Sequence, residues 1–128
     1  MVRRPVQPKV TVLTNTSAMR DICARTRIAI VLSRHETSGR VCIEAGLSGI
    51  PTIAHPSEGV LEALGTAGPF ADRDDIDAWA ACVRRLDDPE TYRSRSVVVR
   101  ARADKWSSMG EFDACEERLF EVCARPRR

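Results

Sequence analysis

Two glutamates flank a glycine in the first half of the chain, and their spacing suits an anionic ligand that also carries hydroxyl groups. Glu36 and Glu44 are separated by seven residues, and Gly39 lies between them where a helix is expected to begin. A glycine lets the backbone approach a ligand closely, and the N–H groups of Gly39, Arg40 and Val41 at a helix N-terminus would favour phosphate. Helical side chains lean toward the N-terminus, so Glu44 can reach hydroxyls of the same ligand, while Glu36 reaches from the loop. These residues predict a site for a diphosphate flanked by hydroxylated rings, as in a nucleotide sugar.

Alternating short apolar runs and helical stretches must position these residues. Strands are expected over 9–14, 28–32 and 51–54, and one more within 65–70; helices are expected over 18–25, 40–48, 60–64, 76–86, 89–106 and 111–124. The run 28–32 is apolar at every position, which is typical of a strand covered on both faces. The pattern predicts an α/β fold, a Rossmann-like three-layer parallel sheet, with a helical C-terminal tail over about 89–124. In such sheets ligands bind beyond the carboxyl ends of the strands, which directs attention to the loops 14–17, 33–39 and 55–59.

Length and composition limit the classes of protein to consider. The 128 residues fit one domain, 1–128, and no apolar run approaches the roughly 20 residues that cross a bilayer. We therefore expect a soluble, cytoplasmic protein without a transmembrane segment. Residues 1–60 carry eight Lys/Arg against four Asp/Glu, a balance of +4, and the remainder carry twelve against fourteen, a balance of −2. A modestly positive half suits an anionic small ligand better than nucleic acid, which calls for a dense basic stripe.

Cysteine and histidine spacing argues against a metal site or a disulfide framework. The five cysteines are odd in number and widely spaced, without a Cys-x-x-Cys pair, and His35 and His55 are the only histidines. None of these lies at the spacing of a zinc site, so no metal and no cofactor is expected. Cys42, between Val41 and Ile43, is expected to be a buried thiol of the core.

A longer ordered string around the two glutamates resembles a known family. The string is Ser33-x-x-Glu36-x-x-Gly39-Arg40-Val41-x-x-Glu44-Ala45-x-x-x-Gly49-Ile50-Pro51-x-Ile53-Ala54. It resembles the E-x7-E region of retaining glycosyltransferases of the GT-B fold, family 4 or group 1 type. The resemblance covers about residues 19–102 and corresponds to part of the C-terminal domain, which binds the donor nucleotide. The chain departs from the family pattern at Ser38 and at Glu58-Gly59, where the family has a Gly-Gly pair.

The resemblance implies a role for each matched residue. Glu36 would be the candidate catalytic residue and contact hydroxyls of the donor sugar, and the N–H groups of Gly39, Arg40 and Val41 would hold the diphosphate. Glu44 would bind the ribose, and the turn 14–16 would lie near the base. The donor would be a UDP- or GDP-sugar, and the acceptor lobe would come from elsewhere, such as a partner chain or a homo-oligomer.

Two other interpretations stay open. For the two glutamates themselves, the simpler alternative is that Glu44 is a solvated helix residue and Glu36 a loop carboxylate. In the first interpretation of the whole chain, it is a non-catalytic, truncated or split subunit that acts as a nucleotide-binding or interaction module. Its interfaces would be an exposed sheet edge and the helices after Pro89. The second is a receiver-like regulatory domain, which is disfavoured because no acidic cluster with an aspartate follows a strand end.

Overall fold

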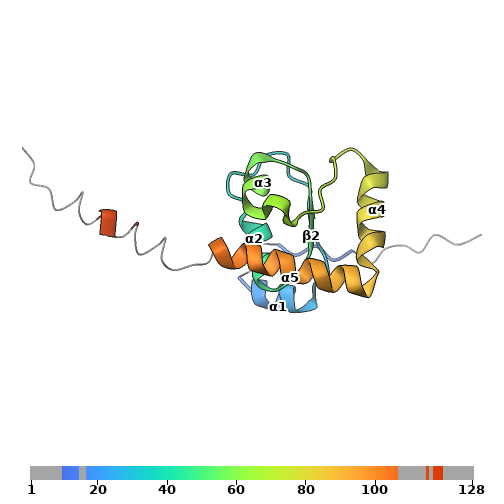
Figure 1. Ribbon diagram of the computed structural model, residues 1–128, viewed down its shortest axis with the longest axis horizontal. Coiled ribbons are helices and arrows are strands. Elements are labelled where there is room, and N and C mark those ends of the chain that lie inside the picture. Colours follow the sequence, from blue (N-terminus) through green and yellow to red (C-terminus); the bar gives the residue numbers. More distant parts are fainter. Residues whose placement is uncertain (1–9, 15–16, 107–114, 116, 120–128) are drawn as a thin grey trace, which may run out of the picture.

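The computed structural model describes residues 10–14, 17–106, 115 and 117–119. Its elements follow the order α1 (Met19–Arg25), β1 (Ala29–Val31), α2 (Arg40–Leu47), β2 (Thr52–Ala54), α3 (Glu58–Leu64), the 3₁₀ helix η1 (Gly65–Ala67), α4 (Ile76–Leu86) and α5 (Pro89–Trp106). Figure 1 shows these elements gathered into one body, with α5 crossing its lower half in the view and α1 below it. The order of strands and helices is that of an α/β fold, as the sequence predicts.

The sheet has two parallel strands that meet in the middle of the body. Ile30 of β1 is paired with Ile53 of β2, and the strands run in the same direction. A single parallel bridge then joins Ala54 to Phe70 on the other side of β2. The strand expected within 65–70 is therefore reduced to this one bridge, because η1 occupies the residues before it. This arrangement leaves β2 central and β1 at an edge among the described residues.

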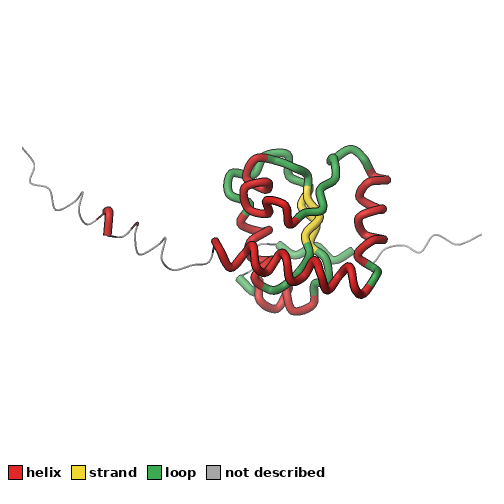
Figure 2. The backbone as a smooth tube through the Cα atoms, in the orientation of Figure 1, coloured by secondary structure: helices red, strands yellow, loops and turns green. Residues whose placement is uncertain are grey.

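Two apolar clusters hold helices against β2. Val31 and Ala54 pack with buried residues of α2 and α3, whereas Ile53 packs with Trp79, Cys82 and Leu86 of α4. Successive side chains of a strand point to opposite faces of the sheet. Ala54 therefore faces α2 and α3, Ile53 faces α4, and both faces of β2 are covered. In Figure 2 the strands lie between α2 and α3 on the left and α4 on the right. A three-layer sheet remains a prediction, since only two strands are described.

Helix α5 is part of the core and is not a detached tail. It contacts α2, α3, α4 and η1. A Cβ added at Gly46 of α2 would lie 2.9 Å from the Cβ of Ala103 in α5, so glycine is what lets these two helices approach. The helix begins where the sequence predicts, because Asp88 Oδ2 accepts hydrogen bonds from the Thr91 hydroxyl at 2.7 Å and the Thr91 N–H at 2.8 Å. These bonds lower the pKa of the Asp88 carboxyl.

Most helix predictions are confirmed, and the acidic run before α4 provides its cap. Asp75 Oδ1 accepts a hydrogen bond of 2.9 Å from the N–H of Ala78, as expected for an aspartate at a helix start. Helix α3 begins at Glu58, two residues earlier than predicted. The predicted last helix, 111–124, lies largely outside the described residues.

The strand predicted over 9–14 is wrong, whereas the strand predicted over 28–32 is confirmed as β1 and only its expected burial is wrong. The expected strand 9–14 forms no strand over its described part, 10–14, where Val10 and Val12 are exposed. The run 28–32 is not covered on both faces, because Ile30 and Leu32 are each 52% exposed. A β-branched run forms a strand only when a neighbour supplies hydrogen bonds and packing, and among the described residues β1 has a neighbour on one side only.

Candidate functional site

The loop between β1 and α2 carries the predicted site and lies at the carboxyl end of the sheet. Strand β1 ends at Val31 and α2 begins at Arg40, so Glu36 and Gly39 occupy the connection. The N–H of Gly59 in α3 donates a hydrogen bond of 2.9 Å to the carbonyl oxygen of Glu36. A Cβ added at Gly59 would lie 2.1 Å from that oxygen, so only glycine permits the contact. The backbone of Glu36 is thus fixed against α3.

Gly39 shapes the start of α2. It is buried and adopts the left-handed conformation, with φ of 55°, and a Cβ there would lie 2.6 Å from the carbonyl oxygen of Gly59. No side chain caps the helix. The N–H groups of Arg40 and Val41 have no acceptor among the described residues, because the first bonds of α2 run from Cys42 and Ile43 to the Gly39 oxygen. This helix start can therefore donate hydrogen bonds to an external anion.

Glu44 already has a partner in the structure. Its Oε1 lies 3.0 Å from Nε of Arg40, one turn earlier on α2. The guanidinium of Arg40 is largely exposed, so the pair is screened by water and contributes little to stability. The ion pair holds the carboxylate toward the start of the helix, which is the direction that the sequence predicts. A ligand hydroxyl at Glu44 would share or replace the contact with Arg40.

A pocket of about 390 Å³ lies beside Glu36. Its lining residues are Arg34, His35, Glu36, Thr37, Glu58 and Glu62. The structure therefore joins Glu36 to two carboxylates of α3. It does not place Gly39, Arg40, Val41 or Glu44 in the lining, and these four occupy the neighbouring surface at the start of α2.

The charges around this pocket differ from those of the helix start. Three carboxylates line it against one arginine, and Arg34 Nη2 lies 3.6 Å from Asp74 Oδ2, so part of its charge is already balanced. Carboxylates accept hydrogen bonds from sugar hydroxyls but repel phosphate. The geometry thus offers a hydroxyl-binding side at Glu36, Glu58 and Glu62 and a phosphate-binding side at the amides of α2.

The sequence pattern gives Glu58 only as a departure from the family pattern, and it predicts no role for Glu62 beyond a surface position on a helix. Both line the pocket, because residues four apart share one face of a helix. The order of the elements indicates this position. Because α3 follows the second strand, its first turn must lie at the same end of the sheet as Glu36. The turn 14–16 lies mostly outside the described residues, and its predicted place near the base stays a prediction.

The surroundings of Cys42 and the hydrogen bond of His55 bear on the chemistry available near this loop. Burial, and after it the charge of Glu36, raises the pKa of the Cys42 thiol to about 11, so this thiol is protonated at neutral pH. Cys42 belongs to the core, as predicted. His55 Nδ1 accepts a hydrogen bond of 3.2 Å from the N–H of Arg73, which places the proton of a neutral imidazole on Nε2. Within the described residues no three His, Cys, Asp or Glu side chains gather as a metal site would require.

The comparisons with known proteins agree with the resemblance at family level. The profile of the glycosyl transferases group 1 family matches residues 1–88, more than half of the chain. Among curated proteins no match is found. No helix in the described part of the chain has the length and apolar character to span a bilayer. The family match supports a general role in glycosyl transfer, and the chain belongs to the group 1 glycosyltransferases.

Proposed function

We propose that this chain is the donor-binding part of a retaining, GT-B type glycosyltransferase that uses a UDP- or GDP-sugar. The observation that carries the proposal is the uncapped start of α2, where two free N–H groups lie between Glu36 in the preceding loop and Glu44 in the helix. A diphosphate at these amides would gain both hydrogen bonds and the favourable field of the helix dipole. Sugar and ribose would then lie on opposite sides of the phosphates.

Each residue has a separate task in this proposal. The amides of Gly39, Arg40 and Val41 hold the diphosphate and stabilise the charge that develops as it leaves the sugar. Glu44 leaves its pair with Arg40 to accept hydrogen bonds from the ribose, and Arg40 is then free to approach the phosphates. Glu36, with Glu58 and Glu62 beside it, accepts hydrogen bonds from the sugar hydroxyls. The acceptor would attack with retention, and its lobe would come from a partner chain or from a homo-oligomer.

Calorimetric titration of the full chain with UDP, GDP and their sugars tests these roles. Glu44→Ala should weaken nucleotide binding by about 10- to 100-fold, because it removes a charged acceptor of ribose hydroxyls. Glu36→Ala should leave nucleotide affinity nearly intact and reduce the preference for the sugar-bearing form. Glu90→Ala, on the exposed first turn of α5, is the matched control. Unchanged nucleotide affinity in Glu44→Ala would refute its ribose role.

The exposed edge of β1 favours a second candidate, an interaction module without catalysis. Ile30 and Leu32 are half exposed there, and unpaired strand edges with apolar side chains are common docking surfaces. Sedimentation combined with thermal unfolding separates the two candidates. A pure interaction module would associate and show no stabilisation by nucleotide, whereas a donor-binding domain would be stabilised by it.

A further inference from the structure

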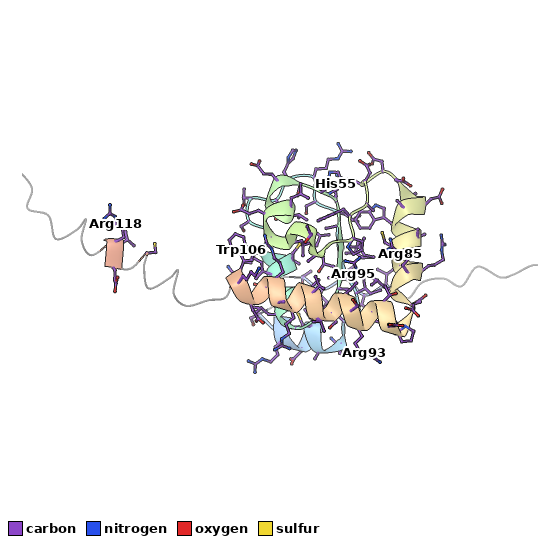
Figure 3. The ribbon with its side chains drawn as sticks, in the orientation of Figure 1. His55, Arg85, Arg93, Arg95, Trp106 and Arg118 are labelled. Carbon is purple, nitrogen blue, oxygen red and sulfur yellow. The ribbon has the colours of Figure 1, made fainter. Side chains whose placement is uncertain are left out.

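A second cleft lies at the end of the sheet opposite to the donor loop. It measures about 770 Å³ and is bounded by the end of α1, the turn between α4 and α5, and the first turns of α5. Arg27 lies two residues before the start of β1, so this cleft adjoins the amino end of the strand, whereas Glu36 follows its carboxyl end. Figure 3 shows Arg93 and His55 at opposite ends of the body. The cleft is therefore distinct from the proposed donor site.

Three arginines from different parts of the chain line this cleft. Arg25 comes from α1, Arg27 from the connection to β1, and Arg93 from α5, and among the described residues Asp87 is the only acidic one in the lining. The lining thus carries three positive charges against one negative charge, a balance of +2. All three arginine side chains belong to exposed residues, so their guanidinium groups are accessible. We call this surface the arginine cleft.

Arg27 is held in place within the arginine cleft. Its guanidinium carbon lies 5.0 Å from the centre of the Tyr92 ring, and its Nη2 donates a hydrogen bond of 3.2 Å to the carbonyl oxygen of Leu86. The hydroxyl of Tyr92 in turn donates a hydrogen bond of 2.8 Å to the carbonyl oxygen of Arg27. These contacts engage one terminal nitrogen of the Arg27 guanidinium and the side of the guanidinium plane that faces the Tyr92 ring. The remaining donors of Arg27 keep a fixed direction, and a preorganised group loses little entropy when it binds.

The charge of Arg93 is not paired with any residue that the structure describes. No described residue forms an ion pair or a hydrogen bond with its side chain, although Asp87 lines the same cleft. Arg25 makes only a 3.4 Å contact from Nε to the carbonyl oxygen of Asp21. Two uncommitted guanidinium groups therefore accompany one that is fixed.

We propose that the arginine cleft binds a phosphate group. Guanidinium groups present paired donors that match the oxygens of phosphate, and a phosphomonoester carries about −1.5 to −2 charges, which balances the +2 of the lining. Arg27 is the fixed donor, and Arg93 and Arg25 close on the remaining oxygens. The source of the group is free phosphate, a small phosphate ester or a lipid headgroup, which share this chemistry. This inference does not depend on the proposed donor site.

Titration of the full chain with inorganic phosphate, followed by the NMR signals of the arginine Nε–H groups, tests the proposal. Saturable shifts are expected for Arg25, Arg27 and Arg93. Arg93→Gln should weaken phosphate binding by about tenfold, and Arg93→Lys, which keeps the charge but loses the paired donors, should weaken it less. Arg100→Gln removes the same charge from α5 outside the cleft and should leave binding unchanged.

Vesicles of phosphatidylcholine with and without phosphatidic acid separate a lipid headgroup from the two soluble sources. Binding that requires phosphatidic acid and Arg93 identifies a lipid headgroup, whereas phosphate binding without vesicle binding identifies a soluble ligand. Either result supports the proposal. Absence of saturable arginine shifts with phosphate, or equal losses in Arg93→Gln and Arg100→Gln, would overturn it. Both residues are exposed, so we expect both variants to fold.

Discussion

Gly59→Ala tests how the donor loop is attached to the rest of the protein. A Cβ at this position would lie 2.1 Å from the carbonyl oxygen of Glu36, whereas ordinary contacts begin at 3.4 Å. The loop must therefore move by more than 1 Å. The obstructing atoms belong to the backbone of Glu36 and Thr37, so no rotation of a side chain can relieve the clash.

The expected loss of stability follows from three contributions. Overpacking costs about 1–3 kcal/mol, and the lost hydrogen bond from Gly59 to Glu36 costs about 1 kcal/mol. Alanine in a helix recovers about 1 kcal/mol relative to glycine. We therefore expect the free energy of unfolding to fall by roughly 1–3 kcal/mol, and the preference for a sugar-bearing nucleotide to fall with the displacement of Glu36.

Urea denaturation and calorimetric titration provide the assay. Gly68→Ala is the matched control, because its added Cβ would meet ring atoms of Phe70 and no atom of the donor loop. The control also loses stability, because the ring must shift, but it should keep the wild-type preference for the sugar-bearing nucleotide. If Gly59→Ala unfolds at the same urea concentration as wild type and keeps its sugar preference, the proposed attachment of the loop is refuted.

Two further substitutions and one measurement of thiol reactivity test the core and the pocket. Thr52→Val should raise the free energy of unfolding by about 1 kcal/mol in urea denaturation, because the Thr52 hydroxyl is fully buried and forms no hydrogen bond with any described residue; a loss would contradict this. Cys42, with its pKa raised to about 11, should react with iodoacetamide at pH 8 far more slowly than exposed Cys115, as peptide mass spectrometry can measure, and equal rates would contradict its burial. Glu58→Gln should tighten nucleotide binding by about two- to fivefold, since it removes a negative charge beside the phosphates, and weaker binding would show that the carboxylate is needed.

The sequence predicts the helices well because their signals are local. Asp75 and Asp88 mark the starts of α4 and α5, and both form the expected capping bonds. Gly39 marks the start of α2, and its positive φ explains why glycine is required there. Such signals act within a few residues, so they do not depend on what the rest of the chain does.

The strands are predicted less well because a strand depends on its neighbours. Val10 and Ile30 have the side chains of buried strands, yet both are exposed, since the described residues bring no further strand to the edge of β1. Prediction of the pocket from the sequence is limited for the same reason. Glu36 could be chosen from its spacing to Glu44, but Glu58 and Glu62 join it only through the packing of α3 against the loop.

NMR titration of the amide N–H groups with a UDP-sugar and a GDP-sugar tests the central claim most directly. The account predicts saturable shifts that are largest at Gly39, Arg40 and Val41, because their N–H groups would bind the diphosphate. Binding that saturates while these three amides stay unchanged, or no binding of either nucleotide sugar, would contradict it.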